Sequence, residues 1–164
     1  MKVEHGFGPV YDAGSRVLIL GSFPSVKSRE VGFYYGHPQN RFWRVLGRVL
    51  SDPVPDGVPE KKAYLSRHGI ALWDSVVSCD VVGSADASIR DPEPADLTRI
   101  LSVAPIEAIL CNGALSFTLL QKNPTKPQDL PVFRLPSTSP ANAAWSPDRL
   151  TKEWDIVKKY ARLR

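Results

Sequence analysis

Four short apolar runs divide the chain and predict the strands of a sheet. They are rich in aliphatic and β-branched residues, and their length is typical of strands buried on both faces: 17–20, 70–73, 108–111 and 132–135. Helical spacing and end signals between and after them predict helices over 41–51, 60–68, 94–103, 112–120 and 148–163. Strands that alternate with helices indicate a three-layer α/β/α fold, with a central, mainly parallel four-stranded sheet and helices on both faces.

Four loops leave one edge of this predicted sheet, at the carboxyl ends of its strands: 21–40, 74–91, 111–113 and 136–147. Ligands bind at this edge in open α/β sheets. We therefore expect one site, built where segments distant in sequence converge. No internal repeat or second hydrophobic unit is visible, so we expect a single domain over residues 1–164.

Composition limits the class of protein. The 164 residues are 43% hydrophobic, which is enough for the core of one domain. No apolar run reaches the length of a membrane span, and segment 1–8 lacks the apolar stretch of a signal peptide. We therefore predict a cytoplasmic protein without a membrane partner, and a monomer by default. A net charge of +4 and a pI near 9.2 permit phosphate binding.

The residues that bind metals are few and scattered. Cys79 and Cys111 are far apart and too few for a cysteine-ligated iron–sulfur cluster, so buried free thiols are expected. The three histidines, His5, His37 and His68, show no ligand spacing. The sequence therefore predicts no metal and no cofactor.

The first loop concentrates polar chemistry beside a strand end. Its last part holds three aromatic residues, a histidine and two amides: Phe33, Tyr34, Tyr35, His37, Gln39 and Asn40. Aromatic faces stack on bases, and amides hydrogen-bond base edges or water. Each residue also has a structural interpretation, because aromatics fill cores and an asparagine at a helix start caps it.

These segments resemble a known family. Gly21-Ser22-Phe23-Pro24-Ser25, followed by a block from Gly32 to Trp43 with Tyr-Tyr-Gly-His-Pro-Gln-Asn-Arg-Phe-Trp, resembles the first motif of the uracil-DNA glycosylase superfamily, above all its hypoxanthine-DNA glycosylase branch. Leu72-Trp73-Asp74 and the segment 136–142 extend the resemblance over nearly the whole chain. The resemblance implies a uracil-DNA glycosylase-like fold, DNA containing a deaminated base as the partner, and no cofactor.

The resemblance also implies roles in the first loop. Asn40 takes the catalytic role, and Tyr35 takes the place of the aromatic residue that stacks on the extruded base, with Tyr34 as the second candidate. His37 is a candidate donor to the leaving base or to a phosphate, although a lone histidine is more often structural.

Base recognition would draw on the other strand ends. The backbone amides of Ser22 and Phe23 are candidates to bind a base carbonyl. A carboxylate at Asp74 accepts the N1–H of hypoxanthine, although Asp is also common in turns. Asn112, which precedes a glycine, fits turn chemistry better than recognition.

The resemblance assigns DNA contacts to the last loop. Its hydroxyls and amides would hold the flanking phosphates, together with a cation of the first motif: Ser137, Thr138, Ser139, Ala141, Asn142 and Arg41. Relatives often present a bulky apolar wedge at this loop, where this chain has Ala141, with Trp145 further on.

One departure bears on the substrate. Uracil-excising branches have asparagine or aspartate where this chain has Phe23, which weakens the expectation of robust uracil excision. We predict a monofunctional glycosylase that prefers hypoxanthine. No lysine falls in the matched motifs, so no lyase chemistry is expected. Two alternatives stay open: uracil, xanthine or mismatched thymine as the main substrate, or a catalytically silent nucleic-acid-binding module.

Overall fold

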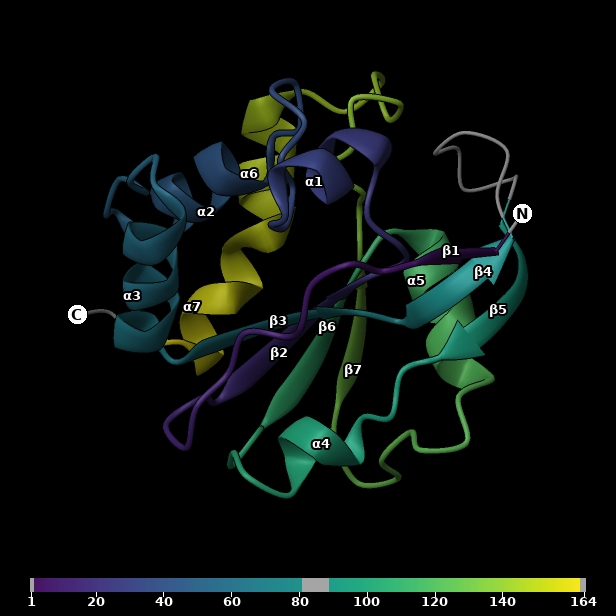
Figure 1. The fold of residues 1–164 in the computed structure, drawn as a ribbon. Helices are drawn as coiled ribbons and strands as arrows, with labels where there is room; N and C mark the ends of the chain where they lie inside the picture. Colours follow the sequence, from purple (N-terminus) through teal and green to yellow (C-terminus); the bar gives the residue numbers. More distant parts are fainter. Residues whose placement is uncertain (1, 81–88, 163–164) are drawn as a thin grey trace.

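A parallel four-stranded sheet forms the core of the computed structural model, which describes residues 2–80 and 89–162 (Figure 1). All pairings in it are parallel, and the spatial order is β3-β2-β6-β7. Its strands are β2 (Val17–Gly21), β3 (Ile70–Asp74), β6 (Ala108–Asn112) and β7 (Val132–Leu135). Every residue of β2 and β3 is buried. The four strands predicted from apolar runs are confirmed.

Helices cover both faces of the sheet, so the predicted three-layer α/β/α class is confirmed. Figure 1 shows one group gathered on one side: α2 (Phe42–Leu50), α3 (Val58–His68), α6 (Pro147–Glu153), the 3₁₀ turn η2 (Trp154–Ile156) and α7 (Val157–Tyr160). The other side carries α4 (Thr98–Leu101) and α5 (Ala114–Gln121). The α2 helix buries one apolar face that includes Phe42, Val45 and Leu46.

A second, antiparallel sheet was not predicted. It has the order β1-β4-β5 and consists of β1 (Lys2–Glu4), β4 (Val76–Asp80) and β5 (Arg90–Pro94). The prediction of one loop over 74–91 is therefore wrong where β4 and the start of β5 lie. Residues 81–88 lie outside the described part. All of β5 is exposed and it contains two prolines, so only its pairing with β4 makes it a strand.

The helix predictions also need correction. The α1 helix (Val26–Val31) was missed, although Ser25 caps its start and Gly32 ends it in the left-handed conformation. The helix predicted over 94–103 is only α4, because Pro94 belongs to β5. The helix predicted over 148–163 is divided into α6, η2 and α7, and its last residue lies outside the described part.

Cys79 and Cys111 are buried free thiols, as predicted. Burial raises the pKa of the Cys111 thiol to about 11, which makes it a poor nucleophile at neutral pH. Within the described residues, no helix has the length and apolar character needed to span a bilayer.

Candidate functional site

A cavity of about 250 Å³ opens at the carboxyl edge of the parallel sheet. It lies where the ends of β2, β3 and β6 meet the segments around α1 and 137–141. Of the residues predicted from the sequence, the structure brings these to its wall: Ser22, Phe23, Tyr34, Tyr35, Asn40, Asp74, Asn112, Ser137, Thr138, Ser139 and Ala141. His37, Arg41 and Asn142 lie outside it. The parallel topology therefore gathers loops that are far apart in sequence.

Gly21 and Asp74 are paired neighbours at the ends of β2 and β3. A Cβ on Gly21 would lie only 2.3 Å from Asp74 Oδ1 and 3.2 Å from the Tyr35 hydroxyl oxygen. Only glycine therefore leaves room for the carboxylate and the phenol over this strand end. Asp74 is 4% exposed, and its Oδ2 accepts a 2.7 Å hydrogen bond from Nε2 of His5.

Tyr35 adopts a left-handed backbone conformation, with φ of 54°. Such conformations cost a non-glycine residue on the order of 1–3 kcal/mol and persist where the surroundings fix them. Here the carbonyl of Tyr34 accepts a hydrogen bond from the Trp43 indole, and the amide of Gly36 donates to the Ser28 hydroxyl. The ring of Tyr35 is therefore held in place before any ligand arrives.

One face of the Tyr35 ring stacks on Phe42, with centroids 4.0 Å apart. Burial, together with the nearby Asp74 carboxylate, raises the pKa of the Tyr35 hydroxyl far above its ordinary value. That hydroxyl lies near Asn112 but makes no hydrogen bond of normal length within the described part of the chain. Tyr35 is thus a neutral aromatic platform at the cavity wall.

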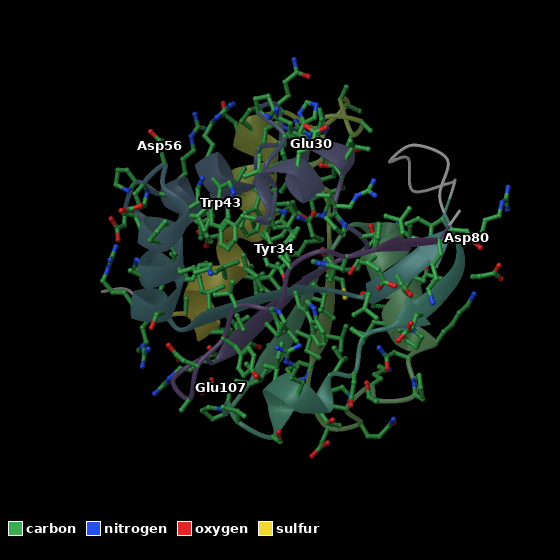
Figure 2. All side chains as sticks on the ribbon, viewed as in Figure 1. Glu30, Tyr34, Trp43, Asp56, Asp80 and Glu107 are labelled. Atoms are coloured by element: carbon green, nitrogen blue, oxygen red, sulfur yellow. The ribbon has the colours of Figure 1, made fainter. Side chains whose placement is uncertain are left out.

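Tyr34 serves the core. It is 2% exposed, its hydroxyl donates to the carbonyl of Gly8 at 2.9 Å, and its ring contacts Phe7 edge-on. Figure 2 shows Tyr34 in the middle of the molecule, between the sheet and α1. Its hydroxyl is occupied, and its ring is packed on several sides. This placement favours Tyr35 over Tyr34 for stacking on a base.

The carboxamide of Asn40 is fixed by two donors. Its Oδ1 accepts from the amide of Phe42 at 2.9 Å and from the hydroxyl of Thr138 at 2.9 Å. The first bond satisfies a free amide at the start of α2, but Arg41 occupies the N-cap position, so the prediction that Asn40 caps this helix is wrong by one residue. Both lone pairs of Oδ1 are used, so Asn40 offers the cavity only the N–H donors of Nδ2.

Thr138 connects Asn40 to β6. The hydroxyl of Thr138 accepts from Nδ2 of Asn112, and the backbone amide of Thr138 donates to Oδ1 of Asn112, both at 3.0 Å. Thr138 is 1% exposed. Asn112 therefore anchors the last loop; its predicted part in base recognition stays a prediction.

Arg41 holds the last loop together. Its guanidinium donates to the carbonyls of Ser139 at 2.8 Å, Asn142 at 3.2 Å, Thr138 at 3.3 Å, and Trp145. These bonds use most of its N–H groups, which disfavours the predicted direct contact with a DNA phosphate. The geometry instead gives Arg41 the task of shaping the loop.

The remaining predicted residues lie around the cavity. The Ser137 hydroxyl accepts a hydrogen bond from the backbone amide of Ser139, and the Ser139 hydroxyl accepts one from the amide of Ala141. Nδ2 of Asn142 donates to the carbonyl of Ser137. Ala141 is exposed at the rim. His37 lines a neighbouring hollow of about 390 Å³, and its Nδ1 accepts from the Gln39 amide.

Sequence reasoning missed two residues of this site. Ser28 of α1 lines the cavity and fixes the backbone beside Tyr35. His5 binds Asp74 from 69 positions away. The alternation of Val3, His5 and Phe7 with polar or small residues was a weak strand signal, but nothing in the sequence indicated the partner.

No group of three or more metal-ligating side chains occurs within residues 2–80 and 89–162. The site is a base-sized cavity whose wall combines one aromatic platform, one fixed amide and one carboxylate. Such a cavity above a parallel sheet suits the binding of a planar heterocycle.

The comparisons with known proteins agree with this geometry. The family model of the uracil DNA glycosylase superfamily matches residues 9–164. The chain belongs to that superfamily.

Individual proteins of the superfamily are similar to this chain. The chain is 33% identical over 162 residues to a protein of Methanosarcina acetivorans named hypoxanthine DNA glycosylase, covering 96% of this chain and 99% of that one. It is 35% identical over 115 residues to a protein of the same name from Methanosarcina barkeri, covering 69% and 73%. A solution NMR structure from Methanosarcina acetivorans, described as a candidate uracil DNA glycosylase, matches with a TM-score of 0.77 and 29% identity, covering 96% of this chain and 99% of that one.

Proposed function

We propose that this protein is a monofunctional DNA glycosylase of base excision repair that removes a deaminated base, hypoxanthine by preference. It would act as a monomer in the cytoplasm, on DNA alone and without a cofactor. The observation that carries the proposal is the cavity in which Tyr35, Asn40 and Asp74 converge at the carboxyl edge of the sheet. The relatives named hypoxanthine DNA glycosylase support the choice of base.

The reaction requires a base that has left the duplex. Flipping costs a few kcal/mol of lost stacking and pairing, and the aromatic face of Tyr35 offsets part of it, since base–aromatic stacking contributes about 1–3 kcal/mol. Phe23 and Tyr35 supply aromatic wall, and Asp74 accepts the ring N–H of the base. The hydroxyls of Ser137 and Ser139 hold phosphates beside the flipped nucleotide.

Asn40 acts on the leaving base. As the glycosidic bond breaks, the sugar gains oxocarbenium character and negative charge develops on the base. The Nδ2 donors of Asn40 face that charge, and its Oδ1 is already occupied by Phe42 and Thr138. Asn40 therefore stabilises the departing base by donation. Water then adds to the sugar and leaves an abasic site.

The test is alkaline cleavage of duplexes that contain one inosine or one uracil. Wild type should cleave the inosine duplex faster, and Asn40→Ala should lose roughly 10²–10³-fold in kcat, the usual loss for a fixed donor at developing charge. Full activity in Asn40→Ala would refute the assignment of Asn40. Lesion binding without any abasic product would favour the silent binding module instead.

A further inference from the structure

His5 lies directly behind the cavity wall. Its backbone amide donates to the carbonyl of Val77 at 2.9 Å, which fixes the residue to β4 of the small sheet. Its side chain is 4% exposed, and Nε2 donates to Oδ2 of Asp74 at 2.7 Å. The small sheet thus delivers an imidazole to the carboxylate at the end of β3.

Three aromatic rings contact the imidazole of His5. The centroids of Phe7, Tyr34 and Phe23 lie 4.4, 5.8 and 6.0 Å from that of His5. Its Nδ1 is buried and has no hydrogen-bond partner within the described residues. A buried nitrogen left without a partner destabilises a fold. The Asp74 contact is therefore the one polar interaction that this side chain makes there.

The pair leaves one carboxylate oxygen available. Oδ2 of Asp74 is taken by His5, whereas Oδ1 lies over Gly21 and accepts no hydrogen bond in the part of the chain that the structure describes. Gly21 and Asp74 both line the cavity. A ligand in the cavity therefore meets an acceptor oxygen that no other group of the described residues bonds, beside the Tyr35 hydroxyl.

An acceptor of this kind distinguishes deaminated adenine or cytosine from the parent base. Adenine and cytosine have a lone pair on the ring nitrogen beside the amino group. Deamination replaces the amino group by a carbonyl and places a hydrogen on that nitrogen. A carboxylate attracts the ring N–H of hypoxanthine or uracil and repels the lone pair of adenine or cytosine.

We infer that His5 is a positioning residue for base selection: its N–H orients the carboxylate of Asp74, so that the cavity accepts hypoxanthine or uracil and rejects adenine or cytosine. The inference rests on the proposed glycosylase function. It assigns a task to a histidine that touches neither DNA nor the reacting atoms.

The experiment compares two bases that differ at the ring nitrogen. Inosine carries the N–H, and 2′-deoxynebularine carries a lone pair there and no carbonyl. The ratio of kcat/KM values for duplexes with inosine and with 2′-deoxynebularine is measured in wild type, His5→Leu and His5→Gln. Leucine removes the donor; glutamine keeps an amide N–H that reaches Asp74.

We expect His5→Leu to lower the ratio of kcat/KM values for inosine over 2′-deoxynebularine by at least about tenfold, because a misplaced carboxylate no longer accepts a hydrogen bond from the ring N–H. His5→Gln should keep the preference within about threefold of wild type, since its amide donor replaces the imidazole. His68→Gln is the matched control, because His68 is also buried and also binds an aspartate, but away from the cavity. Its preference should equal that of wild type.

Three outcomes overturn the inference. One is an equal loss on both duplexes in a folded His5→Leu, which indicates a merely structural role. Another is an unchanged preference in Asp74→Asn, whose amide oxygen can keep the bond from His5 while an NH2 donor replaces the oxygen that faces the ligand. Inactivity of wild type on every deaminated base would refute the proposed function and this inference with it. If circular dichroism shows that His5→Leu does not fold, His5→Asn, whose amide is too short to reach Asp74, takes its place.

Discussion

The protein contains two buried histidines that each bind an aspartate, and they differ in how completely they are bonded. His68 uses both ring nitrogens, one on Oδ2 of Asp52 at 2.8 Å and one on the carbonyl of Arg162. Asp52 also accepts from Arg67 at 2.8 Å. In the pair of His5 and Asp74, one nitrogen and one oxygen have no hydrogen-bond partner within the described residues.

This difference distinguishes a buried polar pair that stabilises the fold from one that also offers an unbonded atom to a ligand. The bond to Asp52 joins the end of α3 to the turn after α2, and His68 also bonds Arg162, whose amide donates to the carbonyl of His68. Every strong donor there has an acceptor, so the interaction contributes to the free energy of folding. In the His5 pair, Oδ1 of Asp74 accepts no hydrogen bond within the described residues and lies beside a cavity. An unbonded acceptor lowers stability, but it is available to a ligand.

The largest expected effect comes from filling the space over β2. Gly21→Ala should lower kcat/KM on the inosine duplex by about 100-fold, because its Cβ displaces the carboxylate of Asp74 and the phenol of Tyr35. Gly57→Ala, at the start of α3, is the control: the nearest atom there is the movable end of Glu60. Steady-state kinetics check both variants, and equal activities would contradict the crowded geometry at Gly21.

The next effect tests the aromatic platform. Tyr35→Leu should lower kcat/KM by about 10- to 100-fold, since base stacking worth about 1–3 kcal/mol is lost. Its melting temperature should also fall, because the stacking of Tyr35 on Phe42 is lost. Tyr64→Leu, beside His68, should lower the melting temperature while the folded protein keeps its kcat/KM. A Tyr35→Leu enzyme with normal turnover at limiting substrate would refute the stacking role.

Thr138→Val should have a smaller effect, a loss of about tenfold in kcat with little change in KM, because the Asn40 carboxamide loses one of its two fixed donors. Thr151→Val serves as the control, since that hydroxyl only donates to the carbonyl of Pro147 within α6. Rapid-quench measurements of single-turnover rates check this. Equal rates in the two variants would show that Asn40 does not need the Thr138 hydroxyl.

The smallest effect on activity belongs to the His68 pair. Hydrogen bonds from Arg67 and His68 hold the pKa of Asp52 below its ordinary value of 3.8. A lowered pKa means that the ionised carboxylate stabilises the fold above pH 3.8 and that this contribution is lost as the pH falls through the lower, folded value.

Asp52→Asn should therefore lower the melting temperature at pH 7, and its difference from wild type should shrink as the pH falls below 3.8. Glycosylase activity at neutral pH should stay unchanged. Calorimetry across the acid range measures the first expectation. A difference between the two proteins that does not change with pH would rule out the ionised form of Asp52 as its cause.

The sequence predicts the parallel sheet and the residues of the cavity wall well, for one physical reason. Strands buried on both faces are nearly uniform in hydrophobicity, and parallel topology fixes which of their ends come together. Tyr35, Asn40 and Asp74 could be placed at one edge in this way. The sequence could not show that Asn40 turns its N–H donors rather than its oxygen to the cavity. That orientation depends on a hydrogen bond from Thr138, almost 100 positions away.

The small sheet was missed because local sequence does not determine it. The β1 strand has three residues, and β5 is exposed, charged and interrupted by prolines, so each exists only through pairing with β4. His5 was missed with it. The left-handed backbone of Tyr35 could not be predicted from the sequence either. It is fixed by the hydrogen bonds of Trp43 to Tyr34 and of Gly36 to Ser28.

The guanidinium of Arg41 gives the molecule a mechanical property. Asn40 and Arg41 are adjacent, and Arg41 ties four carbonyls of the last loop to the start of α2. Under the proposed function, the loop that would hold the phosphates and the amide that would act on the base are therefore tied together by one side chain. If those proposed roles hold, a strand bound out of register would displace the Asn40 amide from the base, and misalignment would slow the chemical step.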